Sequence, residues 1–442
     1  MPTSSPASAL VHHFERFTQQ LDSLDLSALA RQCRFLQRSE RKISMSNLVK
    51  ALLSLSVECR LSLERVAAVI GWCAGTTYSK QALQKRLGPA LEAFLTQLAV
   101  RLVTQFSRSS DAHPWLASFP RVLLHDRTTQ SLPQHLASAF PGSSNQCSHQ
   151  QAAVKVQLIA ELRQGSVQHL SLSSFRRNDQ AAAQDILQCV KPGDLVLRDL
   201  GYFVLSVLEA LIQKGAFFLS RYRHGTIVLD PDSGQPLDLV GLLRTQGFID
   251  RKVWLGEERR LPVRLVAVRV PEAVANERRR RARANRDQRL HPSSEHLFLL
   301  GWNIFVTNVP RDIWPPKAIQ PIYRLRWRVE MVFKTWKSHL GLRELNCRSA
   351  DLLRLSLLTK LLFCVLVCQL CHHFELLQTD GRHVSLLRLG RILAECSCLV
   401  ATAILGISPS QWLSHQIQSH AFYEMRRDRK NFFEILANPL PT

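Results

Sequence analysis

The spacing of apolar residues changes along the chain, from a helical period to a strand-like period near residue 119. Up to about residue 110, apolar side chains recur three and four positions apart, as in Leu48–Leu55 and Val66–Ile70. That period places them on one face of a helix, and almost no strand signal accompanies it. The sequence therefore predicts a helical region over residues 1–110.

One segment of this region, Ser62–Leu87, has the pattern of two helices joined by a glycine-containing turn. This layout suits a helix-turn-helix, in which Lys80 and Lys85 would reach the groove and the phosphates of DNA. Any packed pair of helices gives the same pattern. DNA contact and plain packing are therefore both open at this point.

Beyond residue 119, short apolar runs predict strands, and longer amphipathic stretches predict helices. The predicted strands are 121–126, 152–162, 168–173, 195–197, 216–221 and 302–308, and the predicted helices are 180–190 and 205–213. Strands interspersed with helices predict an α/β core with a mixed sheet.

Two further segments depart from this alternation. Residues 222–300 interrupt it with short strands, polar turns and a run of arginines. Residues 312 to about 342 are predicted as one long helix, and the chain from there to residue 442 is predicted to be helical.

Two aspartates, Asp126 and Asp199, stand where predicted strands end. Side chains that leave adjacent strand ends of an open α/β sheet converge, so strand ends are favoured positions for a site. A lone aspartate in such a place is also typical of a turn or a helix cap. Neither residue is a strong candidate without a third group.

The long predicted helix supplies that group. Five polar residues share an arc of about 80° on its helical wheel: Tyr323, Arg326, Glu330, Lys334 and Lys337. The opposite side carries the apolar residues Ile322, Leu325, Val329, Val332 and Trp336, and is expected to be buried. A solvated face usually mixes several acids with its bases, whereas this face has a single acid. It is typical of a nucleic-acid surface with an embedded metal ligand.

Three carboxylates from two strand ends and one helix face, Asp126, Asp199 and Glu330, can hold two Mg²⁺ or Mn²⁺ ions about 4 Å apart. Such a pair of ions supports in-line displacement at phosphorus. No protein nucleophile is required for this chemistry.

The charge of the chain favours a polyanionic partner. Its 442 residues include 57 Lys and Arg against 35 Asp and Glu, a net charge of +22, which suggests nucleic acid first and an anionic membrane surface second. The longest apolar run, Leu361–Cys371, has about half of the ~20 residues that a membrane span needs. Eleven scattered cysteines and no visible secretory signal favour a reduced, cytoplasmic location.

The arginine run is the densest cluster of positive charge. It consists of Arg278, Arg279, Arg280 and Arg281, followed by Arg283, Arg286 and Arg289. We expect contact with the DNA backbone, with a solvated loop as the alternative, and we expect a mobile segment when DNA is absent because like charges repel. Trp314 and Trp327 are expected to be packing residues.

The spacing Tyr323-x2-Arg326-x3-Glu330-x6-Lys337 resembles the Tyr-Arg-Glu-Lys motif of bacterial insertion-sequence transposases of the IS-four type. Asp126 in HDRTTQSLP resembles the first acidic motif of that family, and Asp199 in LRDLGYF resembles the second. The resemblance extends over residues 35 to 375. One departure is Arg127, where the family commonly has Gly or Ser, which places a basic side chain beside the first acid.

The resemblance implies a ribonuclease-H-like core in which Asp126, Asp199 and Glu330 form the metal triad, with a β-rich insertion before the third acid. It implies that Trp302 stacks on a flipped base with help from Arg221, and that Tyr323, Arg326 and Lys337 hold phosphates. The expected domains are 1–110 (helical, binding DNA ends), 111–221 (core, first part), 222–300 (β-rich insertion), 301–375 (core, second part) and 376–442 (helical, with a role in dimerisation).

The function implied is that of a nucleoid-associated DNA transposase that cuts at the ends of its mobile element and joins them to target DNA. A homodimer would pair the two ends. Two alternatives stay open: a domesticated or inactive copy that acts as a DNA-binding regulator, and a structure-specific nuclease that uses the same metals.

Overall fold

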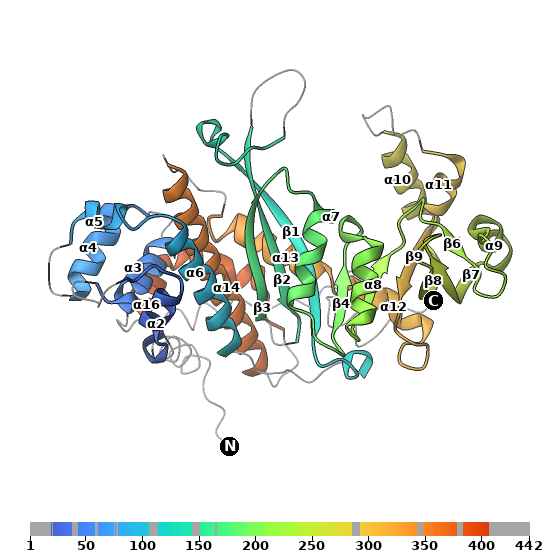
Figure 1. Ribbon diagram of the computed structural model, residues 1–442, viewed down its shortest axis with the longest axis horizontal. Helices are drawn as coiled ribbons and strands as arrows, with labels where there is room; N and C mark the ends of the chain where they lie inside the picture. Colours follow the sequence, from blue (N-terminus) through green and yellow to red (C-terminus); the bar gives the residue numbers. More distant parts are fainter. Residues whose placement is uncertain are drawn as a thin grey trace. The chain divides into compact units, whose positions relative to one another are not determined.

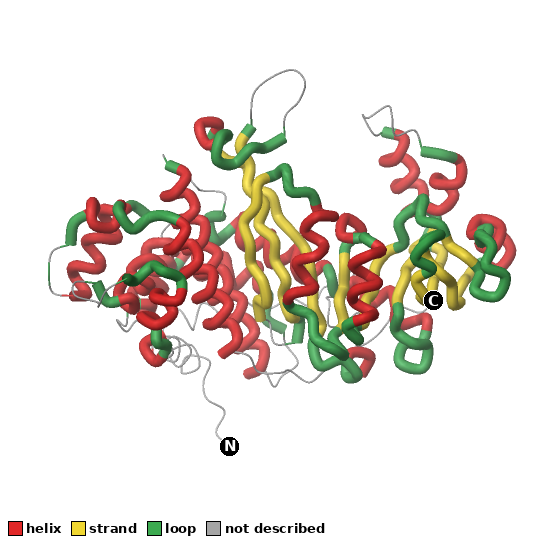
Figure 2. The backbone as a smooth tube through the Cα atoms, viewed as in Figure 1, coloured by secondary structure: helices red, strands yellow, loops and turns green. Residues whose placement is uncertain are grey.

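The computed structural model describes residues 19, 21–37, 43–57, 61–74, 76, 78–105, 114–143, 151–163, 166–284, 292–342, 347, 349–377 and 383–405. The chain forms two compact units. The first unit comprises Met1–Ser110, Arg127–Arg177 and Arg328–Phe433, and the second unit comprises Asp111–Asp126, Asn178–Trp327 and Glu434–Thr442. Figures 1 and 2 show their helices and strands.

The first unit is mainly helical. Its helices are α2 (Leu26–Gln32), α3 (Met45–Val57), α4 (Leu63–Ala74), α5 (Lys80–Gln84), α6 (Pro89–Gln105), α13 (which begins at Trp327 and ends at Ser338), α14 (Ala350–Leu377), α15 (Leu386–Glu395) and α16 (Ser397–Ile404). The helical period of the sequence predicted α3 and α4, and both are present. Among the described residues of 1–110 no strand occurs, as predicted.

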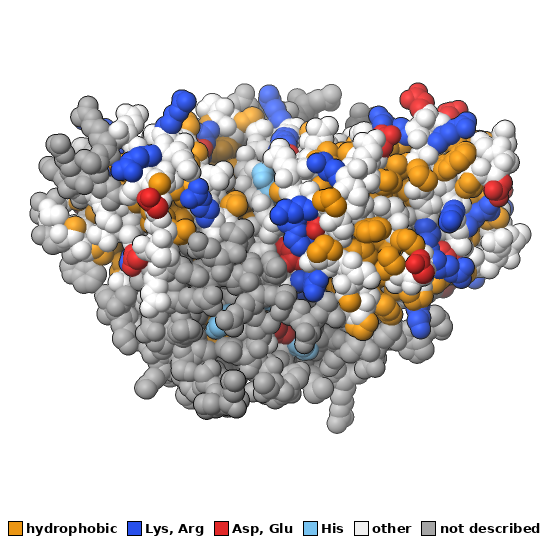
Figure 3. Space-filling model, turned by 60° about the horizontal axis from the view of Figure 1, so that its bottom comes forward, with side chains coloured by type: hydrophobic (Ala, Val, Ile, Leu, Met, Phe, Trp, Pro, Cys, Tyr) orange, Lys and Arg blue, Asp and Glu red, His pale blue; other side chains and the backbone are white. Residues whose placement is uncertain are grey.

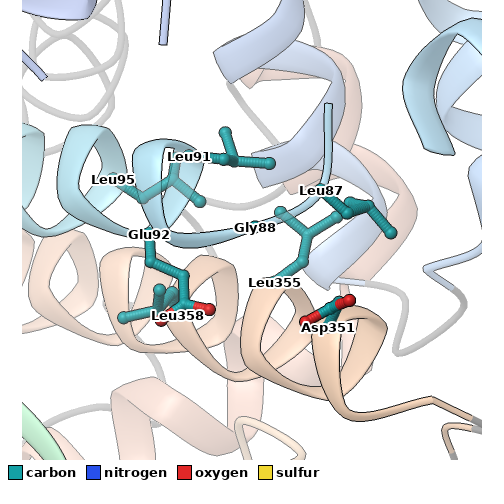
Figure 4. A pocket seen from close by; sticks show the side chains of 8 residues that line it. All are labelled: Leu87, Gly88, Leu91, Glu92, Leu95, Asp351, Leu355 and Leu358. Carbon is teal, nitrogen blue, oxygen red and sulfur yellow. The ribbon is translucent and has the colours of Figure 1, made fainter. Parts of the chain in front are cut away.

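Helix α14 is the centre of the first unit. It packs against α3 and α6, and its residues Leu353, Leu357 and Leu361 are fully buried. Leucines of α6 and α14 line a shallow depression between the two helices, with acidic side chains of both helices beside them (Figure 4). Arg354 lies 3.6 Å from a carboxylate oxygen of Glu92, and this ion pair links α14 to α6.

Three strands in the order β3-β2-β1 belong to the first unit: the end of β1 (Val122–Leu132), β2 (Ala152–Glu161) and β3 (Ser166–Ser174). Strands β2 and β3 pair antiparallel as a hairpin. They match the predicted strands to within two residues at each end, because a run of apolar residues marks β2 and its side chains are nearly all buried.

The second unit contains a mixed sheet in the order β1-β4-β5-β9-β8-β7-β6. Its further strands are β4 (Leu195–Arg198), β5 (Phe217–Arg221), β6 (Val228–Leu229), β7 (Phe248–Leu255), β8 (Leu261–Arg269) and β9 (Trp302–Thr307). The start of β1 pairs parallel with β4, and β4 pairs parallel with β5. The remaining pairs are antiparallel. The predicted mixed α/β class is therefore confirmed.

The helices of the second unit are α7 (Asp179–Ala182), α8 (Leu205–Gln213), α9 (Leu239–Gln246), α10 (Glu272–Arg283), α11 (Ser294–Leu299) and α12 (Pro316–Arg324), with short 3-10 turns at Ala183–Gln188 and Leu200–Tyr202. Helix α8 has the predicted bounds. The helix predicted at 180–190 is instead a single α-turn followed by a 3-10 helix.

The segment between β5 and β9 extends the sheet of the second unit. Strand β8 pairs with β9 from Arg264 opposite Thr307 to Arg269 opposite Trp302, and β7 and β6 follow outward. The short strands predicted within 222–300 are thus present, together with α9, α10 and α11. The main-chain hydrogen bonds of β9 connect this segment to β5.

Candidate active site

Asp126 and Asp199 follow directly after the parallel pairing of β1 with β4. That pairing runs from Val122 opposite Leu195 to His125 opposite Arg198. Both aspartates therefore leave neighbouring strands at the same level of the sheet, as predicted from the sequence. Asp199 follows the last residue of β4, but the predicted end of β1 at Asp126 was wrong. The strand continues to Leu132, with Thr128 and Gln130 buried along it.

Both aspartates contact one guanidinium group. Nη1 of Arg326 lies 3.1 Å from Oδ2 of Asp126, and Nε of Arg326 lies 3.5 Å from Oδ1 of Asp199. The side chains of Arg326 and Asp126 are only 10% and 13% exposed, whereas Asp199 is 40% exposed. All three residues belong to the second unit.

Arg326 lies at a break between two helices. The amides of Leu325 and Arg326 donate to carbonyls three residues earlier, Ile322 at 3.0 Å and Tyr323 at 3.1 Å, so the i to i−4 ladder stops here. Helix α12 ends at Arg324 and α13 begins at Trp327. The prediction of one continuous helix over 312–342 was therefore wrong, and a single helical wheel does not relate all five polar residues.

The break divides the five polar residues between the units. Tyr323 and Arg326 belong to the second unit, and Glu330, Lys334 and Lys337 belong to the first. Lys334 is exposed and Glu330 half-buried in the first turn of α13. Nζ of Lys337 donates to the carbonyl oxygen of Thr129 at 2.7 Å, which ties α13 to β1.

The expected apolar side of this region is largely buried. Ile322, Leu325, Val329 and Trp336 are each at most 1% exposed, whereas Val332 is half-buried. The helical wheel therefore predicted the burial of these apolar residues correctly, with the exception of Val332.

Tyr323 is a buried phenol beside the arginine. Burial raises the pKa of Tyr323 to about 12, against the opposing charge of Arg326. Its ring lies 5.2 Å from the ring of Phe305. Arg221 ends β5, is half-buried and pairs in register with Phe305 on β9. The group at position 323 therefore keeps its proton and remains a hydrogen-bond donor at neutral pH.

The three tryptophans discussed in the sequence analysis, Trp302, Trp314 and Trp327, differ in burial. Trp314 is fully buried, as expected of a packing residue, and its Nε1 donates to the carbonyl of Trp115 at 2.6 Å. Trp302 begins β9 and is 6% exposed, with its ring 6.3 Å from that of Phe298. Trp327 is 59% exposed, so its prediction as a packing residue was wrong. Trp327 is the first residue of α13, and its ring lies 6.0 Å from the Arg326 guanidinium.

The arginine run forms the last turns of α10, so the expected mobile segment was wrong over Arg278–Arg283. Arg278 donates to Oδ1 of Asn303 at 2.8 Å and to the carbonyl of Trp302, and burial lowers its pKa. Arg279 donates to the carbonyl of Leu297 and to Glu272. Arg286 and Arg289 lie outside the described residues.

The other described arginines of the run, Arg280, Arg281 and Arg283, are exposed. Arg280 and Arg281 are 77% and 79% exposed, and both pair with Glu277. The run therefore divides into an anchoring half and an exposed half. The side chains of Arg280, Arg281 and Arg283 are exposed and can reach a DNA phosphate without unfolding α10.

Lys80 and Lys85 begin and follow the short helix α5, and both are exposed. The side chain of Ser79 caps this helix by accepting from the amide of Ala82 at 3.4 Å. Leu83 is buried on its inner side. On the face drawn in Figure 3, Lys and Arg side chains are scattered among hydrophobic ones.

Sequence reasoning missed a buried aromatic contact behind the two acids. The ring of Tyr202 lies against His125 and Arg198, the residues that precede Asp126 and Asp199. Side chains alternate along a strand, so a residue before an outward acid points to the core. In the sequence, His125 directly precedes Asp126 and Arg198 directly precedes Asp199. Tyr202 follows the second acid by three residues, and these positions could have predicted the contact.

A divalent cation fits the two aspartates in charge and in donor chemistry. Carboxylate oxygens are hard ligands of the kind that Mg²⁺ and Mn²⁺ bind, and these two already converge on a cation. Over the part of the chain that the structure describes, no group of three or more His, Cys, Asp and Glu side chains is clustered for metal binding. A pair of aspartates that can bind a divalent cation suits metal-dependent phosphoryl transfer.

Comparisons with known proteins agree with that class. A model of the family described as "Transposase DDE domain" matches residues 117–367. The transposase for insertion sequence element IS231B of Bacillus thuringiensis subsp. berliner is 30% identical over 351 residues, which cover 73% of this chain and 72% of the relative. The transposase for element IS231D of Bacillus thuringiensis subsp. finitimus is 31% identical over 337 residues, covering 71% and 70%.

Among solved structures, a piggyBac transposase synaptic complex with hairpin DNA aligns with a TM-score of 0.44 at 10% identity, covering 94% of this chain and 84% of that chain. The chain belongs to the DDE transposases, enzymes of DNA transposition that cleave DNA and join its strands. The resemblance to insertion-sequence transposases of the IS-four type is thereby confirmed. Within the described residues, no helix is long and apolar enough to span a membrane.

Proposed function

We propose that Asp126, Asp199 and Glu330 are the three acids of this transposase, and that together they bind two Mg²⁺ or Mn²⁺ ions. The observation that carries the proposal is the convergence of Asp126 and Asp199 on one guanidinium, at the end of a parallel strand pair. Glu330 is proposed as the third acid because the spacing Tyr323-x2-Arg326-x3-Glu330-x6-Lys337 resembles the motif of the family. The core that holds them is proposed to be ribonuclease-H-like.

Each side chain of the proposed active site has a task. Bound metal ions would activate a water or a 3′-hydroxyl and stabilise the leaving oxygen. The Tyr323 phenol keeps its proton at neutral pH and donates to a phosphate oxygen. Arg326, Lys334 and Lys337 neutralise the phosphates that flank the scissile bond. Trp302 stacks on a flipped base with Arg221 beside it, which requires Trp302 to be uncovered first.

The remaining proposals concern DNA and assembly. Element ends are bound by the helical residues 1–110, including Lys80 and Lys85, and the exposed part of α10 adds backbone contacts. The proposed domain limits are 1–110, 111–221, 222–300, 301–375 and 376–442. A homodimer pairs two ends of the element, and the protein acts at the bacterial nucleoid.

Incubation of the full-length protein with linear DNA that carries the sequences flanking its own gene tests this function. With Mg²⁺ we expect breaks at the element ends and joining of the freed 3′ ends to a target, and with EDTA we expect neither. Nicks without joining would favour a structure-specific nuclease. Binding without any metal-dependent product would favour a regulator.

Variants of the three acids test the site assignment in the same assay. Asp126→Asn, Asp199→Asn and Glu330→Gln should each lower cleavage about a thousandfold or more, because a lost metal ligand removes several kcal/mol of transition-state stabilisation. Binding of the DNA ends should remain. Asp232→Asn, which neutralises an exposed aspartate of the second unit, is the matched control and should cleave like wild type.

A further inference from the structure

The guanidinium of Arg326 stands where a cation would be needed by the two aspartates. It lies 3.1 Å from Asp126 and 3.5 Å from Asp199, through different nitrogens. Arg326 and Asp126 are almost fully removed from water. One side chain therefore bridges both acids at once.

Two carboxylates that converge repel each other unless a counter-charge lies between them. A permanently charged guanidinium removes that repulsion, since arginine does not lose its proton in proteins. The bridge therefore offsets the negative charge of both acids and orients them without any other cation.

We propose that Arg326 is an internal counter-ion that competes with divalent metal for Asp126 and Asp199. This inference rests on the proposed function, in which the two aspartates bind metal. A guanidinium and a divalent cation cannot share these oxygens, because like charges repel at such short distance. Entry of metal therefore requires Arg326 to leave at least one carboxylate.

The surroundings of Arg326 provide a place for it to go. The residue belongs to the two-residue turn between α12 and α13, where the hydrogen bonds of the helix are already interrupted. Its guanidinium lies 5.9 Å from the ring of Tyr323 and 6.0 Å from the ring of Trp327. Trp327 is the exposed ring, so a turn of the side chain toward it keeps a cation–π contact while opening the acids. A DNA phosphate would then meet the released guanidinium.

The competition predicts that removal of Arg326 increases the affinity for metal instead of decreasing it. If Arg326 only positioned the aspartates, its removal would weaken metal binding. If it occupies their cation site, its removal strengthens metal binding by the DNA-free protein, because metal no longer has to displace a charge.

Isothermal titration of the full-length, DNA-free protein with Mn²⁺ tests this sign. We expect Arg326→Gln to bind Mn²⁺ at least tenfold more tightly than wild type. Arg324→Gln, which removes the same charge two residues earlier on α12, should bind like wild type. Arg326→Lys keeps the charge but can pair with fewer oxygens, so its affinity should lie between those of wild type and Arg326→Gln.

Thermal melting gives a second readout that does not depend on a calorimetric signal. Without metal, Arg326→Gln should melt below wild type, and saturating Mn²⁺ should raise its melting temperature by more than it raises that of wild type. Equal or weaker Mn²⁺ binding by Arg326→Gln, with Asp126→Asn abolishing binding, would overturn the counter-ion proposal alone. Mn²⁺ binding that survives both Asp126→Asn and Asp199→Asn would overturn the metal assignment itself.

Discussion

His125 and Arg198 stand opposite each other in the parallel pairing of β1 with β4, and both lie against the ring of Tyr202. The His125 ring is 4.1 Å from that of Tyr202, and the Arg198 guanidinium is 5.7 Å from it. All three residues are at most 1% exposed. Since strand side chains alternate, this contact lies on the face opposite Asp126 and Asp199 and fixes the backbone that carries them.

Removal of the Tyr202 ring should therefore loosen both acids. Tyr202→Ala should lower the free energy of unfolding by about 3 to 5 kcal/mol, the cost of deleting a buried aromatic side chain, as measured by urea denaturation. Tyr202→Phe keeps the ring and serves as the control, with a loss of about 1 kcal/mol. An unfolding curve for Tyr202→Ala that overlays wild type would show that the ring does not support the strands.

The two halves of the arginine run should have separable effects. Replacement of Arg280 and Arg281 together by Gln should weaken DNA binding and reduce the slope of log affinity against log salt by about 2, because two phosphate contacts are lost. The free energy of unfolding of this double variant should be unchanged, since exposed ion pairs contribute little to stability.

Arg278→Gln should behave in the opposite way. It leaves the carbonyl of Trp302 and the side chain of Asn303 without their donor, so the melting temperature should fall while the salt slope stays constant. A loss of salt slope in Arg278→Gln with no loss of stability would reverse the division between an anchoring and an exposed half.

The sheet could be predicted from the sequence because its strands are simple. Leu195–Leu197 of β4 are fully buried, and a short apolar run is the ordinary signature of such a strand. The two acids could be found for the same reason, since each directly follows residues that pair in the sheet. Their convergence on Arg326 could not, because the three residues are 73 and 127 or more positions apart and their meeting is tertiary.

The helix break could not be predicted for a related reason. Neither glycine nor proline stands at Leu325 or Arg326, although Pro321 lies inside α12, so the residues at the break give no local signal for it. The ion pairs of Arg326 with both acids favour the turn instead, and tertiary contacts of this kind override propensity. The helical arginine run, by contrast, had a local signal, since Glu277 stands four residues before Arg281 and pairs with it.

A buried ion pair links β7 with β8 in the second unit. Arg264 donates to both oxygens of Asp250, at 2.5 and 2.9 Å, and to the carbonyl of Trp314. Asp250→Ala should cost about 3 to 5 kcal/mol of unfolding free energy, because it leaves a buried guanidinium without its counter-charge.

Asp230→Ala is the matched control for that variant. It removes the partner of Arg251 in a partly exposed pair, so its unfolding free energy should fall far less than that of Asp250→Ala. Comparable losses in the two variants would mean that burial does not set the strength of the Asp250 pair.

Tyr222 should make stability depend on pH at the alkaline end. Burial raises the pKa of Tyr222 to about 12, and Glu295 adds to the rise. Its hydroxyl donates to the carbonyl of Thr226 at 2.7 Å. The folded state therefore keeps a proton that the unfolded state loses above pH 10, and stability falls as pH rises from about 10 to about 12.

The size of this effect is about 2 kcal/mol over that interval. Tyr222→Phe has no ionisable hydroxyl at this position in either the folded or the unfolded state, so its unfolding free energy should fall less steeply with pH. The gap between wild type and Tyr222→Phe, measured by urea denaturation at several pH values, should shrink above pH 10. A gap that stays constant to pH 12 would mean that the phenol ionises normally.

The gathering of three distant acids around metal is tested most directly by iron-directed cleavage of the protein. Fe²⁺ bound in place of Mg²⁺, with ascorbate and peroxide, produces hydroxyl radicals that cut the nearest peptide bonds, and mass spectrometry locates the cuts. We expect cuts beside Asp126, Asp199 and Glu330, suppressed by excess Mg²⁺. Cuts that omit any one of these three segments, or that excess Mg²⁺ leaves unchanged, would contradict the account.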